Sequence, residues 1–164
     1  MLYTNSSMQE FLKSKKDLIA KSSLDPMLWE VINKGFYRLE DCVFLREIFP
    51  KNYMDIDFDQ IYDLAIYRDY SGLECVINKF HIEDFIQNDV FIQAILFAKR
   101  FRMQWKKQFL NQPITTIVGF QEDEIGKLAT FTFHCNRTNE IVYDIDNIEK
   151  FSQPVFIEVM DNCS

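Results

Sequence analysis

The spacing of apolar residues along the chain changes at Pro113. Before it, apolar side chains recur three and four positions apart, the spacing of one face of an α-helix; after it, apolar and polar side chains alternate as along a β-strand. We therefore predict an α+β fold, in which an N-terminal helical region packs on a C-terminal antiparallel sheet of about four strands. Residues 1–164 are expected to form a single domain, mainly helical over 1–112 and mainly a β meander over 113–164.

The predicted helices have recognisable ends. Ser7, with Glu10 three positions later, forms a capping box at the start of the first helix. Asp25 before Pro26 begins the second helix, and Gly35 ends it because glycine accepts the left-handed backbone of a C-terminal cap. The other predicted helices are a short one before Pro50, one over 58–70, one after a break at Ser71-Gly72, and the longest over 89–110, whose apolar first half indicates burial.

The predicted strands are residues 114–120, 127–135, 140–145 and 155–160. Their short connections favour an antiparallel meander with the helices packed on one face. We expect the odd-numbered strand residues to face the helices and the even-numbered ones to face solvent. Because opposite residues in an antiparallel pair share a face, Phe133 is expected to lie beside Ile141 or Tyr143.

The composition is that of a folded protein without long linkers. Hydrophobic residues make up 48% of the chain and include sixteen Phe, while there are only four Gly and four Pro. Cys42, Cys75, Cys135 and Cys163 form no C-x-x-C pair, so we expect reduced thiols in a cytoplasmic protein. The start of the chain lacks a signal-peptide pattern, and the most apolar run, 90–98, is too short to span a membrane.

The net charge of −7 is concentrated in the last third of the chain. Residues 1–112 contain 16 acids and 15 bases, whereas residues 113–164 contain 9 acids and 3 bases. Nucleic acids and anionic membrane surfaces are bound through Lys and Arg, so neither is an expected partner.

One basic run, KRFRMQWKK at 99–107, supports an alternative function. It could be a nucleic-acid-binding module in which Phe101 and Trp105 stack on bases. We favour the C-terminal end of a buried helix, because cations are stabilised there by the helix dipole and because residues four apart share an apolar stripe.

One pattern resembles a metal site. Asp55, Asp57 and Asp59 have the spacing of a calcium-binding loop, but Gln60 and Ile66 occupy the positions where that loop needs glycine and glutamate. We therefore expect no metal, and we interpret the three acids as the start of a helix, where negative charge is favourable.

No catalytic or cofactor motif is present in the sequence. His134 and Cys135 are adjacent in a predicted strand, so their side chains point to opposite faces and do not form a catalytic pair. We expect no enzymatic activity, no cofactor and no small-molecule ligand. Because carboxylates are abundant, a small carboxylate-dependent hydrolase is kept as a further alternative.

Most acids of the last third are expected to share one surface. Three lie in the loop between the first two strands, and the others lie on even-numbered positions of the last two strands or just beyond the third. A solvated sheet face without a partner is the simplest alternative. Phe120 and Phe156 are expected to act as apolar anchors beside the acids. The predicted partner-binding acids are Glu122, Asp123, Glu124, Glu140, Asp144, Asp146 and Glu158.

Two stretches, GFQEDEIGKLATFTFH and EIVYDIDNIEKFSQPVFIEVM, give the chain its resemblance to a known group. It resembles the immunity proteins of bacterial contact-dependent growth inhibition and related polymorphic toxin systems, which are small, acidic, cytosolic proteins of helices and a sheet. The resemblance implies an inhibitor that binds one cognate toxin domain, often a nuclease with a basic cleft, made by the same cell.

Overall fold

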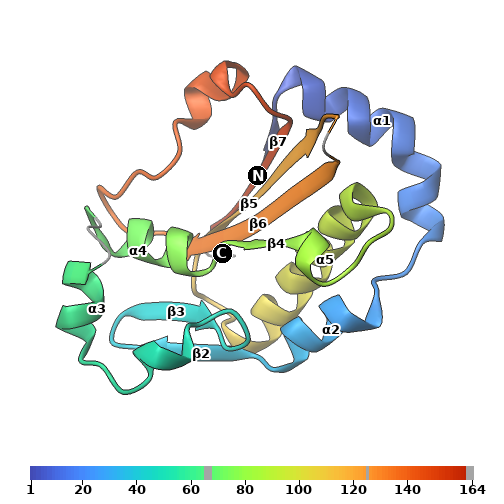
Figure 1. Ribbon diagram of the computed structural model, residues 1–164. Coiled ribbons are helices and arrows are strands. Elements are labelled where there is room, and N and C mark those ends of the chain that lie inside the picture. Colours follow the sequence, from blue (N-terminus) through green and yellow to red (C-terminus); the bar gives the residue numbers. More distant parts are fainter. Residues whose placement is uncertain (65–67, 125, 162–164) are drawn as a thin grey trace.

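The computed structural model describes residues 1–64, 68–124 and 126–161 and has the predicted α+β fold. Figure 1 shows its elements in space. The helices are α1 (Ser6–Lys21), α2 (Pro26–Asn33), α3 (Phe58–Leu64), α4 (Tyr70–Ile77) and α5 (Val90–Gln108), with the short 3-10 helices η1 (Lys51–Tyr53), η2 (Ile82–Asp84) and η3 (Ile145–Lys150). The strands are β1 (Leu2–Thr4), β2 (Phe36–Leu39), β3 (Cys42–Leu45), β4 (Phe80–His81), β5 (Ile114–Glu122), β6 (Lys127–Cys135) and β7 (Val155–Met160).

The main sheet is antiparallel but is not a meander. Its strand order is β1-β7-β5-β6-β4, so β5 is flanked by both β6 and β7. The predicted strand over 140–145 is wrong: these residues are irregular until η3 begins at Ile145. The edge of β6 that such a strand would need is occupied instead by β4 and by the α4 side chains Glu74 and Asn78, while Phe133 lies opposite Thr116 of β5.

The helix predicted before Pro50 is also wrong, because residues 36–45 form the β2–β3 hairpin. Half of the residues in each strand are aromatic or β-branched, and such residues favour the extended backbone. Glu40 occupies the turn with a positive φ of 49°.

Some predicted helix ends are confirmed and others are displaced. Asp25 accepts a hydrogen bond from the Met27 amide at the start of α2, and Gly35 follows that helix with a φ of 73°, as expected. The first helix is capped by Asn5, whose side chain accepts from the Met8 amide, and not by the predicted capping box at Ser7.

The predicted break at Ser71-Gly72 lies inside the first turn of α4. Asp69 caps this helix by accepting a hydrogen bond from the Gly72 amide, with 2.7 Å between the atoms. After this helix the chain turns back into strand β4 at Phe80.

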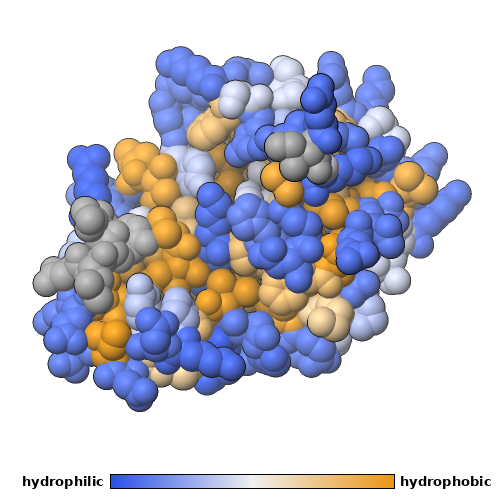
Figure 2. Space-filling view, in the orientation of Figure 1, coloured by the Kyte–Doolittle hydropathy of each residue, from blue (hydrophilic) through white to orange (hydrophobic). Residues whose placement is uncertain are grey.

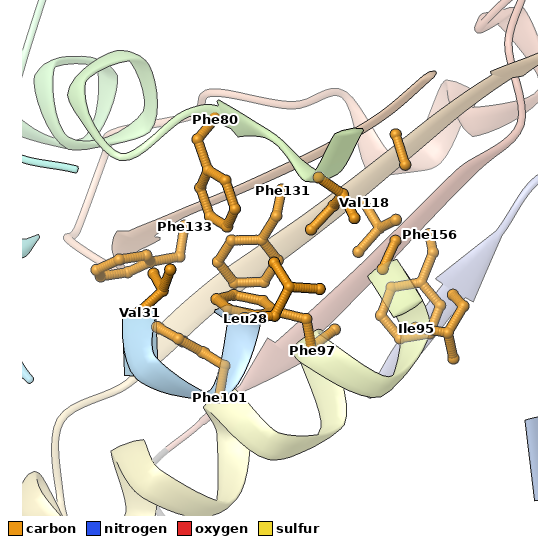
Figure 3. Packing of buried hydrophobic residues seen from close by; sticks show 14 of the residues in the cluster. Leu28, Val31, Phe80, Ile95, Phe97, Phe101, Val118, Phe131, Phe133 and Phe156 are labelled. Atoms are coloured by element: carbon orange, nitrogen blue, oxygen red, sulfur yellow. The ribbon is translucent and has the colours of Figure 1, made fainter. Parts of the chain in front are cut away.

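Helix α5 crosses one face of the main sheet and forms the centre of the core (Figure 1). Its first half is buried, as its uniformly apolar sequence predicts. Figure 3 shows Phe97 and Phe101 of α5 beside Phe131 and Phe133 of β6. The ring centroids of Phe97 and Phe131 are 4.8 Å apart, and so are those of Phe101 and Phe133. The aromatic residues therefore join the helix to the sheet.

The opposite face of the sheet is covered too, so the prediction of helices on one face only is wrong. Thr132 and His134, on even-numbered positions of β6, are 3% and 6% exposed. The hydroxyl of Thr132 donates to the carbonyl of Cys75 in α4, and residues 140–145 line a hollow beside His134. Among the described helices, none is long and apolar enough to cross a membrane.

Candidate functional site

The turn between β5 and β6 presents acidic side chains, and backbone hydrogen bonds close this turn. Glu122, Asp123 and Glu124 are all exposed, as predicted. The amide of Asp123 donates to the carbonyl of Gly126, whose own amide donates back to the carbonyl and the side chain of Asp123. Glu122 pairs with Lys127 across the hairpin at 3.1 Å. We call residues 121–124 the acidic tip.

A small pocket with both apolar and charged residues in its lining adjoins the acidic tip. It has a volume of about 90 Å³ and lies where α1, the start of α5 and the end of β5 meet. Phe120 lines the pocket but is only 2% exposed, because its ring packs edge-on against those of Phe11 and Phe91 at centroid distances of 5.0 and 4.9 Å. Leu18, which is half exposed, and Glu122 also line it. Phe120 is thus part of a receiving pocket and does not project as an anchor.

The second predicted anchor is buried, and the acid beside it is already paired. Phe156 is 7% exposed in the main core, so its predicted position on a solvated face is wrong. Glu158 lies on the same side of β7, towards α5, where it accepts a hydrogen bond from Arg102 at 2.5 Å. Even-numbered residues of β7 face the helix because β7 pairs with β5 in a register that joins residues of equal parity.

The remaining predicted acids lie on the segment between β6 and β7. Asp144 and Asp146 are exposed at the start of η3. Figure 1 shows η3 at the same end of the sheet as the acidic tip, and Figure 2 shows hydrophilic side chains along this upper end. Glu140 is at the other end of the segment, where it accepts from the Ser71 amide at 2.8 Å. The structure therefore does not assemble the single acidic surface that was predicted.

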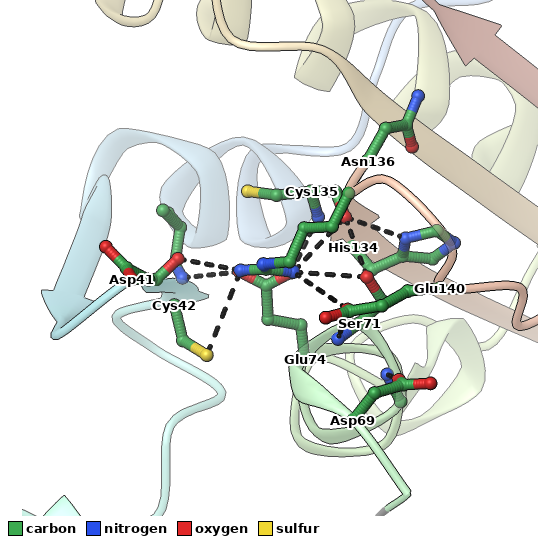
Figure 4. Close-up of polar contacts among 12 residues, drawn as sticks. Asp41, Cys42, Asp69, Ser71, Glu74, His134, Cys135, Asn136 and Glu140 are labelled. Carbon is green, nitrogen blue, oxygen red and sulfur yellow. Dashed lines mark hydrogen bonds and ion pairs between the residues drawn. The ribbon is translucent and has the colours of Figure 1, made fainter.

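A buried polar network centres on Glu74 and Arg137, neither of which was predicted as a site residue from the sequence (Figure 4). Glu74 is fully buried in α4, and its two oxygens accept from the two terminal nitrogens of Arg137 at 2.8 and 3.0 Å. Arg137 also donates to the carbonyls of Cys135 and Asp41. Such a pair satisfies the hydrogen-bonding groups of a buried charge and fixes its neighbours.

Side chains of α4 also join the two sheets. Glu74 accepts from the amides of Val43 in β3 and Cys135 in β6, at 2.7 and 2.6 Å. Asn78, one turn later and also fully buried, accepts from the Leu45 amide and donates to the carbonyls of both Val43 and Phe133. A glutamate and an asparagine four apart in a short apolar helix were the available signal for this arrangement.

The thiols and the histidine near this network are in their neutral states. Burial, followed by the nearby Glu74 carboxylate, raises the pKa of Cys42 to about 12, and burial also raises the pKa values of Cys75 and Cys135. Burial lowers the pKa of His134 below its usual value. The ring of His134 bonds through Nδ1 to the carbonyl of Cys135, while the Cys135 thiol accepts from Gln112, so the two side chains act separately. This arrangement contains no activated thiol.

The features behind the alternative functions are placed as follows. Phe101 and Trp105 of the basic run are 0% and 1% exposed in the core, so their rings are not accessible to bases. Arg100 lies over the ring of Trp29 at 3.7 Å. In the described parts of the chain, no three His, Cys, Asp or Glu residues are grouped so that they could hold a metal ion.

Comparison with known proteins gives a family. Residues 3–164 match the family described as "Uncharacterized protein PM0498 family". The chain belongs to this family. The PM0498 protein of Pasteurella multocida (strain Pm70), whose printed name is "Uncharacterized protein PM0498", is 28% identical over 162 residues, covering 98% of this chain and all of the relative. No solved structure matches the chain.

Proposed function

We propose that this PM0498-family chain binds and neutralises a basic partner protein, in the manner of the immunity proteins that it resembles. The observation that carries the proposal is the acidic tip, where Glu122, Asp123 and Glu124 are exposed on a turn beside a small pocket. In this proposal the protein acts in the cytoplasm and the partner is a toxin domain, such as a nuclease with a basic cleft.

The distribution of bases in the last third strengthens the negative charge of its surface. Residues 113–164 contain three bases, of which Arg137 is bound to the buried Glu74 and Lys127 is paired with Glu122. Arg137 therefore contributes little to the surface charge, and exposed acids outnumber exposed bases in this part of the chain. A concentrated charge of one sign attracts an oppositely charged protein and accelerates association.

The pocket beside the tip supplies the contact that charge alone lacks. Its volume of about 90 Å³ suits one side chain of a partner, and its lining includes the rings of Phe91 and Phe120. Two acids, Glu122 and Asp89, and two lysines, Lys15 and Lys127, also line it. A partner side chain could place its apolar stem on these rings and its polar end among the charged groups. Desolvated contacts of this kind contribute most to slow dissociation.

The test begins with affinity capture from the native host, followed by association kinetics with the captured partner. Reversing the tip with Glu122→Lys, Asp123→Lys and Glu124→Lys should slow association about tenfold or more at low salt. The matched control reverses Asp55, Asp57 and Asp59, which are exposed on another part of the surface. Equal association rates for the two triple variants would remove the acidic tip from the interface.

A second variant tests the pocket independently of the tip. Leu18→Trp should fill the pocket because Leu18 is half exposed at its edge, so the fold has room for the larger ring. We expect faster dissociation of the partner at an unchanged association rate. Unaltered dissociation would exclude the pocket from the contact.

A further inference from the structure

A larger groove lies on a different part of the surface, between α1, α5 and the β1–β7 edge of the sheet. Its volume is about 610 Å³, and its lining is almost entirely apolar. Ile19 of α1, Ile95 of α5 and Phe156 of β7 form its floor and are 7%, 2% and 7% exposed. The groove uses none of the residues that line the pocket beside the acidic tip.

Lysines stand on both helical walls of this groove. On α1, Lys16 lies three positions before Ile19, and Lys13 one turn nearer the N-terminus of the helix. On α5, Lys99 lies four positions after Ile95. Residues three and four apart are neighbours on a helix surface, so each wall has an apolar base and a cationic rim. The lysine stems extend the apolar surface while their ammonium groups remain in water.

The charge of this groove is not compensated within the chain. In residues 1–64, 68–124 and 126–161, Lys13, Lys16 and Lys99 form no ion pair, whereas Lys34 and Lys127 do. No carboxylate lines the groove. In a protein with a net charge of −7, this combination of an apolar floor and unpaired cations complements an anionic, amphipathic ligand.

We propose that this groove binds an amphipathic α-helix of a partner protein, with acidic residues on both sides of its apolar stripe. The arrangement of the lysines favours a helix, because a fatty acid has one charge at one end and leaves the opposite rim unpaired. An amphipathic helix lies in an apolar groove through side chains three and four apart, and its flanking acids meet both rims. This surface is separate from the acidic tip and takes a ligand of the opposite charge.

The test measures fluorescence polarisation of a labelled synthetic helical peptide, with Leu at positions three and four apart and Glu on both sides of that stripe. The Glu peptide should bind, and the same peptide with Lys in place of each Glu should not. Changing Lys13, Lys16 and Lys99 to Glu should weaken binding about tenfold or more. The matched control changes Lys51, Lys79 and Lys107 to Glu; these lysines are exposed, lie outside the groove and should leave binding within about twofold.

A second variant tests the groove without changing its charge. Ala20 is exposed at the groove, so Ala20→Trp should obstruct the peptide and leave the unfolding curve unchanged. Failure of the Glu peptide to bind, or equal effects of the two lysine triple variants, would overturn the proposal. Binding of laurate but not of the peptide would assign the groove to a small amphiphile instead. Dimers in light scattering that the groove triple variant abolishes would assign it to a second copy of the chain.

Discussion

Glu74 and Arg137 form a two-pronged ion pair at the junction of α4, β3 and β6, with nitrogen–oxygen distances of 2.8 and 3.0 Å. The Glu74 carboxylate is fully buried, and it also accepts hydrogen bonds from backbone amides of both sheets. Removing either partner leaves the other charge and its neighbours unsatisfied in a poorly hydrated site. The pair is thus a requirement for folding in this arrangement, whatever ligand the surface binds.

Glu74→Gln should lower the free energy of unfolding by about 3–5 kcal/mol, because it removes the buried counter-charge of Arg137 and leaves only the more distant Glu140, at 4.0 Å. Urea titration at neutral pH measures the change. The exposed pair Lys34–Glu47 is the control, and Lys34→Gln should cost about 1 kcal/mol or less. A loss for Glu74→Gln as small as that of Lys34→Gln would contradict this assignment.

Asn5→Ala should destabilise the protein more than Asp25→Ala, although both residues cap helices. Asn5 is 2% exposed; it accepts from the amides of Met8 and Val155 and donates to the carbonyl of Gln153. Its loss should cost about 2–4 kcal/mol, since several buried groups lose their partners. Asp25→Ala removes one side-chain hydrogen bond to Met27 and should cost about 1 kcal/mol. Thermal unfolding of the two variants gives the comparison.

His134 should make the protein less stable as the pH falls below neutrality. Burial lowers its pKa in the fold, so between the folded pKa and the unfolded value of 6.5 the unfolded chain binds a proton that the native state does not. The free energy of unfolding therefore decreases as the pH is lowered through 6.5. His134→Gln should flatten this dependence between pH 7.5 and 5, measured by urea unfolding at each pH.

The described thiols should resist modification in the native state. Cys42, Cys75 and Cys135 are buried and their pKa values are raised, so the reactive thiolate is scarce at pH 8. Cys163 lies outside the described residues, and Cys163→Ser removes its contribution. The Cys163→Ser protein should show no rapid reaction with a disulfide reagent in buffer and three reactive thiols in urea. Rapid reaction of any thiol of this variant in buffer would contradict the burial of the three cysteines.

Local signals in the sequence were sufficient for much of the fold. The spacing of apolar residues and the capping residues predicted α2, α5 and the β5–β6 hairpin, because those elements depend on neighbours close in the chain. The false strand at 140–145 alternates apolar and polar residues as a strand does, but β4 and side chains of α4 occupy the edge of β6 with which it would have paired. Which segment pairs with an edge is decided by long-range competition, and periodicity contains no information about that.

Of the candidate site, the sequence predicted correctly only the exposed acids of the tip, because their exposure follows from the local sequence. The acidic tip follows from three consecutive acids before a glycine in a tight turn. The positions of Phe156 and Glu158 did not follow from the local sequence. The face to which an even-numbered residue points depends on the strand with which its own strand pairs. The lysine-rimmed groove combines residues from α1, α5 and β7, which are far apart in sequence, so no local pattern reveals it.

The bonds from α4 to β3 and β6 depend on a match between two repeats. Four residues of an α-helix advance about 6 Å, and two residues of a strand advance about 6.6 Å. Glu74 and Asn78 can therefore reach peptide groups two residues apart on either side, at Val43 and Leu45 and at Cys135 and Phe133. The side chains of Glu74 and Asn78 thus make the backbone hydrogen bonds that an additional strand between β3 and β6 would make. Inserting a single residue between positions 74 and 78 would rotate one of these two side chains by about 100° away from both sheets. The two sheets would then lose this connection.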